Sequence, residues 1–195
     1  MLELVELFLA SILSNNMALI FILGMCPLIA VSTTIDNAFN MGVAVVVVTT
    51  LTAIINWPIH QLLILTGTTQ LSLLVFIIVI AAFVQFLEMF VAKFSPKIYE
   101  SFGIFLPLIT VNCIVLAISL FFQTREYTFA QTAVFSFGSS IGWLLAIVLL
   151  AGVRQKVKRI SNIPKGLKGR GIAFLILGIL ALAFIGFSGI GRVTF

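Results

Sequence analysis

The fold is decided by the stretch GMCPLIAVS, residues 24–32, and by its counterpart VNCIVLAIS, residues 111–119. Each stretch holds one of the chain's two cysteines, and in each a serine follows the cysteine six residues later. Both stretches lie inside long hydrophobic runs, one in each half of the chain. The matched spacing predicts that Cys26 and Cys113 occupy equivalent points of an internal duplication.

The composition around these stretches is that of a membrane protein. Hydrophobic residues make up 62% of the chain and charged residues 9%, and the mean hydropathy is +1.28. Soluble proteins contain about a quarter charged residues. The hydrophobic runs lack the apolar and polar alternation at every second position that a membrane β-barrel requires. We therefore predict an all-α polytopic membrane protein.

The hydrophobic runs are long enough to be counted as membrane spans. A transmembrane helix needs about 20 apolar residues to cross a hydrocarbon core of roughly 30 Å. Six stretches reach this length: residues 8–31, 39–57, 71–92, 103–122, 131–152 and 171–190. The connections between them are short, so we expect a single membrane domain with no soluble catalytic domain.

The distribution of Lys and Arg predicts the orientation. The segment Arg154–Arg170 carries seven of them and Lys93 and Lys97 share another connection, whereas Arg125 and Arg192 fall on the opposite side. Cytoplasmic loops are enriched in basic residues, so we expect a multi-pass protein of the bacterial inner membrane with both termini outside. The basic segment suits topogenesis, or contact with anionic lipid or an acidic partner. It lacks the exposed aromatic residues of a nucleic-acid surface.

The six predicted spans divide into two repeats of three, residues 1–98 and 99–195. Because three is odd, the second repeat enters the membrane from the opposite side, which makes the two repeats inverted. Inverted repeats place their sites near the midplane, where helices are broken at Gly or Pro. We expect breaks in the first and fourth spans, which contain Asn15, Asn16, Gly24 and Pro27 in one case and Gly103, Pro107 and Asn112 in the other.

The two cysteines have three interpretations at this point. A single Cys is often a small, inert, buried hydrophobe. Two equivalent thiols beside broken helices also suit a shared metal site, although they supply only half of the thiolates of an ordinary iron–sulfur cluster. A disulfide is the third interpretation, but the chain shows no secreted disulfide framework.

Four segments carry a family resemblance, and they are distributed over essentially the whole chain: residues 16–26, 84–89, 102–113 and 186–189. They resemble the E subunits of the sodium-pumping NADH:quinone oxidoreductases. The A subunits of the related Rnf complexes share the Leu-Gly-x-Cys-Pro pattern, which Pro27 fits, and they are the alternative. Residues 142–147 and 163–169 are more similar to the sodium-pumping family.

This resemblance implies a role in electron transfer coupled to sodium transport. It implies that Cys26 and Cys113 ligate the iron of an intramembrane [2Fe–2S] cluster, with two further cysteines from the paralogous D subunit. The flavin-bearing B, C and F subunits would be the other partners. This chain contains no Gly-rich dinucleotide loop, so we expect it to bind neither NADH nor flavin.

Several polar residues within the spans are further candidates. Glu88 lies near the end of the third span, and an acidic group at membrane depth is a functional-site hypothesis; it suits ion coupling or a helix-end carboxylate. Asn112, like Asn15 and Asn16, suits either an ion path or the capping of broken backbone. Small residues at 138–142 permit close packing against another helix or subunit. A rival function is an inverted-repeat transporter or channel in which the cysteines are incidental.

Overall fold

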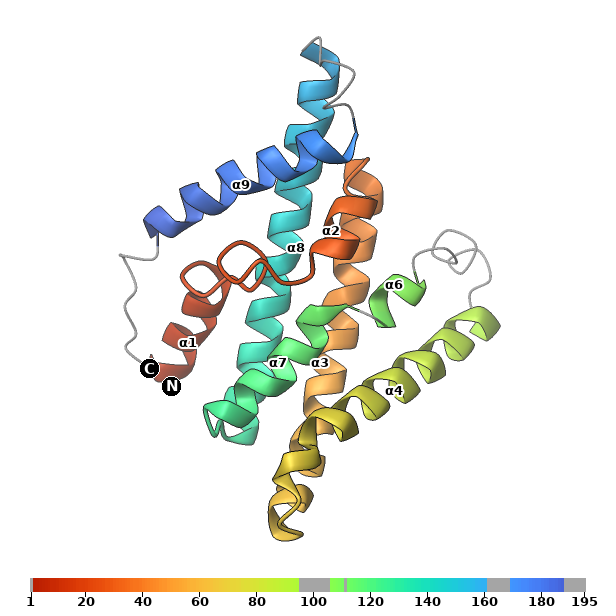
Figure 1. Cartoon of the computed structure of the whole chain (residues 1–195), viewed down its shortest axis with the longest axis vertical. Helices are drawn as coiled ribbons and strands as arrows, with labels where there is room; N and C mark the ends of the chain where they lie inside the picture. The colour runs from red at the N-terminus through yellow and green to blue at the C-terminus, as the bar shows by residue number, and fades with distance from the viewer. Residues whose placement is uncertain (1, 95–105, 111, 161–168, 188–195) are drawn as a thin grey trace.

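The computed structural model describes residues 2–94, 106–110, 112–160 and 169–187, which form helices and the turns between them (Figure 1). In chain order the elements are α1 (Leu2–Ile12), α2 (Met25–Val31), α3 (Ile35–Leu65), the 3-10 helix η1 (Thr69–Leu71), α4 (Ser72–Phe94), α6 (Leu106–Thr110), α7 (Cys113–Thr124), α8 (Phe129–Ile160) and α9 (Arg170–Phe187). These residues contain no β-strand. The predicted all-helical class is therefore confirmed.

Two long helices form the centre of the molecule. Helices α3 and α8 have 31 and 32 residues, which at 1.5 Å per residue makes each about 47 Å long. They lie side by side and run in opposite directions (Figure 1). Helix α1 packs against α8, and helices α2 and α7 pack against α3. The short helices that carry the two cysteines are thus held against this central pair.

The lengths of the helices decide which of them can span a membrane unaided. Three helical segments of the described chain are long and apolar enough, namely Ile35–Leu65, Thr69–Phe90 and Phe129–Ile160. The shorter apolar helix Arg170–Gly186 falls below this length. A helical membrane protein is what these lengths support, and the count of six spans stays a prediction.

The helix is interrupted inside both spans where a break was predicted. Residues 13–24 separate α1 from α2 and contain no regular helix. Within this connection Ile22 and Gly24 have left-handed backbone angles, with φ of 56° and 75°. Asn112 is likewise outside helix, between α6 and α7. Of the other predicted breakers, Gly103 lies outside the described residues, whereas Pro27 lies within α2 and Pro107 within α6.

The predicted end of the second span at residue 57 was wrong. Helix α3 continues through Pro58 to Leu65, although proline removes one helical hydrogen-bond donor. Side-chain contacts hold the helix just before the proline. The Asn56 Nδ2–H donates to Ser119 Oγ at 2.9 Å, and the Trp57 indole N–H donates to the Tyr127 carbonyl at 3.0 Å. Tertiary contacts therefore outweigh the local preference for a turn.

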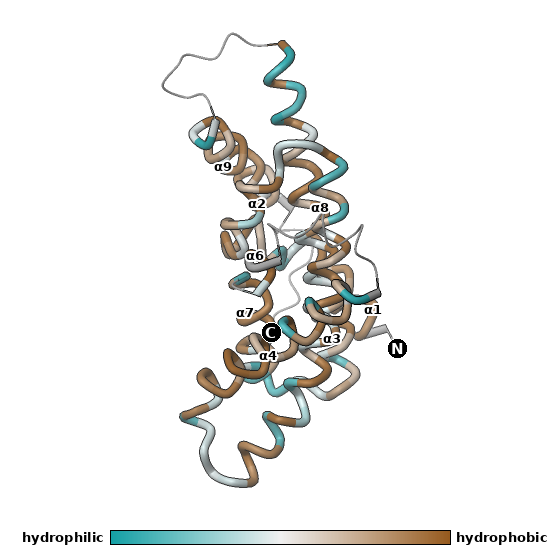
Figure 2. Tube along the Cα trace, turned by 90° about the vertical axis from the view of Figure 1, so that its right-hand side faces the viewer, coloured by the Kyte–Doolittle hydropathy of each residue, from teal (hydrophilic) through white to brown (hydrophobic). Residues whose placement is uncertain are grey.

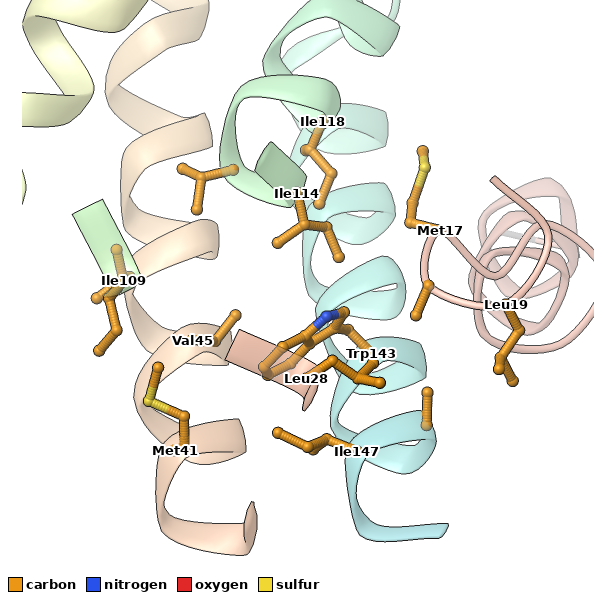
Figure 3. Close-up of a cluster of buried hydrophobic side chains, with 14 of the residues drawn as sticks. Met17, Leu19, Leu28, Met41, Val45, Ile109, Ile114, Ile118, Trp143 and Ile147 are labelled. Atoms are coloured by element: carbon orange, nitrogen blue, oxygen red, sulfur yellow. The ribbon is translucent and has the colours of Figure 1, made fainter. Parts of the chain in front are cut away.

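Trp143 of α8 lies at the centre of the core. Its side chain is fully buried, and around it lie Leu28 of α2, Val45 of α3, Ile114 of α7 and Ile147 of α8 (Figure 3). The cluster joins elements from both halves of the chain. In a bilayer, van der Waals packing of such side chains holds helices together, because lipid is as apolar as the core. The core therefore fixes the half-helix α2 relative to α7.

Small residues of α8 let α1 approach closely, as predicted. A Cβ added at Gly142 would lie 3.1 Å from the carbonyl oxygen of Ile12, and one added at Gly138 would overlap Ser11 Oγ. By contrast, a Cβ at Gly152 of the same helix would meet nothing within 4 Å. The small residues at 138 and 142 are thus packing residues of the α1–α8 interface.

The outer helices present apolar side chains. On α4 the side chains of Ile78, Phe86 and Met89 are more than half exposed, as are Ile179 and Leu182 on α9. Hydrophobic colour covers most of the trace in Figure 2, and hydrophilic colour marks the C-terminal end of α8. Apolar surfaces of this extent are not found on soluble monomers. They suit contact with lipid or with other membrane subunits.

Candidate functional site

Each cysteine lies in the first turn of a short helix that follows an interruption. Cys26 is the second residue of α2, and Cys113 is the first residue of α7. Both side chains are exposed, and both cysteines are free thiols. The two cysteines thus share this local setting, and the internal duplication stays a prediction.

A hydrogen bond joins the two cysteine segments. The backbone N–H of Gly24 donates to Cys113 Sγ at 2.9 Å, across 89 positions of sequence. Gly24 precedes Cys26 by two residues, and consecutive Cα atoms are 3.8 Å apart, so their Cα atoms lie within about 7.6 Å of each other. The structure therefore brings the cysteines of both halves to one place. N–H groups that donate to sulfur are a typical feature of iron–sulfur sites.

Gly24 also contacts α8. Its carbonyl oxygen accepts a hydrogen bond from the indole N–H of Trp143 at 3.3 Å. A Cβ at this position would lie 2.5 Å from Trp143 Nε1 and 3.1 Å from Asn112 Oδ1. With a φ of 75°, the position favours glycine for its backbone as well. Both the conformation and the space at Gly24 therefore require the absence of a side chain.

Asn112 caps the helix that carries Cys113. Its side chain is 2% exposed, and its Oδ1 accepts a hydrogen bond from the backbone N–H of Ile114 at 3.3 Å. The Asn112 Nδ2 is buried and has no hydrogen-bond partner among the described residues. Of the two roles predicted for Asn112, the capping role is confirmed, and ion coupling stays a prediction.

Asn16 organises the other interruption. Its Nδ2 donates to the carbonyls of Ile12 at 3.0 Å and Gly142 at 2.9 Å, and its Oδ1 accepts from the N–H groups of Ala18 at 2.9 Å and Leu19 at 3.3 Å. The side chain is fully buried. One asparagine thus binds three backbone groups at the interruption, which need partners when buried, and one carbonyl of α8. Capping, the structural role predicted for Asn16, is confirmed.

Each of the two serines that follow the cysteines accepts a hydrogen bond from a long helix in the other half of the chain. Ser32, the residue that directly follows α2, accepts a hydrogen bond at 2.6 Å from Arg154 of α8, and Ser119 of α7 accepts one at 2.9 Å from Asn56 of α3. Each serine is fully buried. Each half-helix is therefore fixed to the long helix of the opposite half.

Sequence reasoning placed Arg154 in a basic surface segment, and this was wrong. Arg154 lies within α8 and is 5% exposed. Ile147, Leu150 and Ala151 of the same helix are fully buried, and their spacing of three, four and seven residues from Arg154 is that of one helix face. Helical periodicity was the signal that could have predicted its burial.

Glu88 does not belong to the cysteine contacts. It lies on α4 beside Gln85, Met89 and Ala92, which line a cavity of about 250 Å³. Its side chain is partly buried. The residues that line this cavity all belong to α4 and include neither cysteine. The part of Glu88 in ion coupling stays a prediction.

A second hollow of about 510 Å³ lies where α3, η1 and α7 end, and its lining includes Trp57, His60, Gln123, Glu126 and Tyr127. Gln123 follows Cys113 by ten residues of α7, a rise of about 15 Å. This hollow is therefore distinct from the cysteine site. No cavity was predicted at this place from the sequence.

The helices and the site define the protein as a helical membrane protein whose two halves join at a pair of cysteines beside broken helices. Comparison with known proteins identifies the family. The family described as "Rnf-Nqr subunit, membrane protein" matches residues 4–191. The chain belongs to this Rnf-Nqr family.

Relatives with similar sequences are E subunits of one complex, the Na(+)-translocating NADH-quinone reductase. The E subunit from Neisseria meningitidis serogroup C is 49% identical over 191 residues, which cover 95% of this chain and 96% of that protein. The one from Maridesulfovibrio salexigens is 45% identical, with 96% and 98% covered. The one from Methylococcus capsulatus is 48% identical, with 95% and 97% covered. The predicted resemblance to the E subunits is thereby confirmed.

Proposed function

We propose that this chain is the E subunit of a sodium-translocating NADH:quinone oxidoreductase and that Cys26 and Cys113 supply two thiolates to an intramembrane [2Fe–2S] cluster. The hydrogen bond from Gly24 N–H to Cys113 Sγ carries the proposal, because it joins the two cysteine segments at 2.9 Å. The names of the relatives support the assignment to the complex. When bound, such a cluster accepts and releases single electrons.

The chain offers half of the ligands that this cluster needs. A [2Fe–2S] cluster is ordinarily held by four thiolates. Within the described residues, no three His, Cys, Asp or Glu side chains gather into a group that could hold a metal ion. Both cysteines are exposed, so another subunit can approach them. The paralogous D subunit is the proposed source of the two missing cysteines.

The proposed architecture is an inverted repeat of two three-helix units, residues 1–98 and 99–195. The reciprocal binding of Ser32 to Arg154 and of Ser119 to Asn56 supports it, since each repeat contributes the same pair of roles. Figure 1 adds that α4 and α9, which follow α3 and α8 in the chain, are both tilted relative to those long helices. Six spans with breaks near the midplane complete this proposal.

The proposed setting is the bacterial inner membrane, with both termini outside. The D subunit completes the cluster, and the flavin-bearing B, C and F subunits are the remaining electron-transfer partners. Neither NADH nor flavin binds this chain in the proposal. The basic residues near the end of α8, Lys158 and Arg159, then face the cytoplasm.

Sodium coupling follows from electrostatics. An added electron places negative charge in a region of low dielectric constant, where charges interact more strongly than in water. A cation, or a shift of the half-helices, then balances that charge. Gly24 is the point where such a shift would act, because its N–H and its carbonyl contact α7 and α8. Glu88 and Asn112 are the candidates for ion coupling.

Chemical analysis of iron tests the proposal. The chain is co-expressed with its D partner, purified anaerobically in detergent, and assayed for iron and acid-labile sulfide per complex. Wild type is expected to hold two irons and two sulfides at this site, and Cys26→Ser and Cys113→Ser are each expected to lose both. An assembled wild-type complex without iron at this site would reject the cluster and favour a transporter or channel function.

A further inference from the structure

Arg154 carries a positive charge into the interior of the protein. It is 5% exposed and extends the buried face of α8 beyond Ala151. Burial of a charged side chain is costly unless hydrogen bonds or an opposite charge compensate it. A charge buried at such a cost calls for a role.

Arg154 contacts the C-terminal end of α2, the short helix that carries Cys26 in its first turn. One guanidinium nitrogen, Nη1, donates to the carbonyl of Ile29 at 2.9 Å and to Ser32 Oγ at 2.6 Å. Basic side chains commonly bind the last carbonyls of a helix in this way. Arg154 therefore fixes the C-terminal end of α2.

These acceptors leave the positive charge in place. The carbonyl of Ile29 and the hydroxyl of Ser32 are both neutral, and Nε of Arg154 is buried with no hydrogen-bond partner in the described part of the chain. Ile29 follows Cys26 by three residues of α2, a rise of about 4.5 Å. Ser32, the other acceptor, follows Cys26 by six residues. The guanidinium thus lies about 5–9 Å or more along α2 from Cys26, and its charge acts on the cysteine site over a distance of this order through the protein.

The equivalent contact in the other half is neutral. Asn56 binds Ser119 at 2.9 Å, and Asn56 and Ser119 are both fully buried. The two half-helices are therefore fixed by hydrogen bonds of the same kind, of which only the one at α2 carries charge. The contact between Asn56 and Ser119 is therefore a control: it fixes a short helix in the same way as the Arg154 contact but carries no charge.

We infer that Arg154 is a positioning residue for Cys26 whose charge stabilises an electron at the cysteine site and so raises its reduction potential. This inference rests on the proposed function. A positive charge lowers the free energy of the reduced, more negative state, whereas the oxidised state gains less. Removal of the charge shifts the potential to more negative values.

Redox titration of the assembled complex, followed by electron paramagnetic resonance, measures this potential. Arg154→Gln is expected to shift the midpoint potential of the cluster to more negative values, and Arg154→Lys is expected to keep most of the wild-type value. Asn56→Leu, which removes the neutral contact, is expected to shift it less than Arg154→Gln does.

A further variant tests the charge of Arg154 while the contact between α8 and α2 is kept. Ser32→Asp places a carboxylate beside Arg154, so it neutralises the charge while an ion pair still fixes α2. It is expected to lower the potential in the same direction as Arg154→Gln. If the charge-altering variants that assemble hold their full iron content and keep the wild-type potential, the inference about Arg154 is wrong and the proposed function still stands. A wild-type complex without iron overturns the proposed function, and this inference with it.

Discussion

Replacement of Gly24 by alanine is expected to destabilise the protein by about 2–5 kcal/mol. The left-handed conformation, with a φ of 75°, costs a non-glycine residue about 1–2 kcal/mol. The new methyl group would lie 2.5 Å from Nε1 of Trp143, a side chain that is fully buried and has little room to move. Overpacking of this kind costs about 1–3 kcal/mol.

Gly67→Ala is the matched control. Gly67 also has a left-handed φ, of 68°, but a Cβ there would meet nothing within 4 Å. Its substitution is therefore expected to show only the backbone cost of about 1–2 kcal/mol. The difference between the two variants isolates the contact of Gly24 with Trp143 and Asn112.

The free energy of unfolding is measured in mixed detergent micelles by titration with a denaturing detergent. The iron content of the complex is measured on the same variants, because displacement of Gly24 also moves the donor that binds Cys113. Gly24→Ala is expected to lose more stability than Gly67→Ala and to lose iron. Equal losses of stability in the two variants, with iron retained in Gly24→Ala, would refute the packing at Gly24.

Three further variants test other parts of the structure. Asn16→Ala removes the side-chain partner of four backbone groups and is expected to cost about 2–4 kcal/mol in the same unfolding assay. Asn15→Ala is the control and is expected to cost less, because the hydrogen bond of Asn15 is made by its backbone N–H, which the substitution keeps. Similar losses of stability in the two variants would refute the role of Asn16. Gly138→Ala crowds the α1–α8 interface and is expected to cost about 1–3 kcal/mol, while Gly152→Ala in the same helix has open space and is expected to be neutral or stabilising. Glu88→Gln is expected to raise the sodium concentration needed for half-maximal turnover of the assembled complex with iron content unchanged, and an unchanged sodium dependence would remove Glu88 from the ion path.

The helical class and several helix positions could be predicted from the sequence because hydropathy alone determines them. The third predicted span, 71–92, matches α4 to within a residue at its start, and the fifth, 131–152, lies within α8. The interruption near Asn16 was also predictable, since adjacent asparagines and Gly24 disfavour an unbroken helix. The end of α3 was not, because the contacts that continue it past Pro58 come from residues distant in sequence.

The candidate site was predictable in its residue types and not in its contacts. Matched spacing singled out Cys26 and Cys113, and the structure shows both in the first turns of short helices. The bond from Gly24 to Cys113 is a tertiary contact that local pattern does not specify. Arg154 was missed for a different reason, because a positive charge beside a run of basic residues suggests a surface position when the helical periodicity before it is ignored.

One spectrum tests the shared cysteine site. The complex of this chain with its D partner is purified anaerobically, reduced, and examined by electron paramagnetic resonance, as wild type and as Cys26→Ser and Cys113→Ser. We expect the wild-type complex to give the signal of a reduced two-iron cluster and each single substitution to abolish it. A full signal in either variant would show that its cysteine is not a ligand, and the two halves of the chain would then not meet at a cluster.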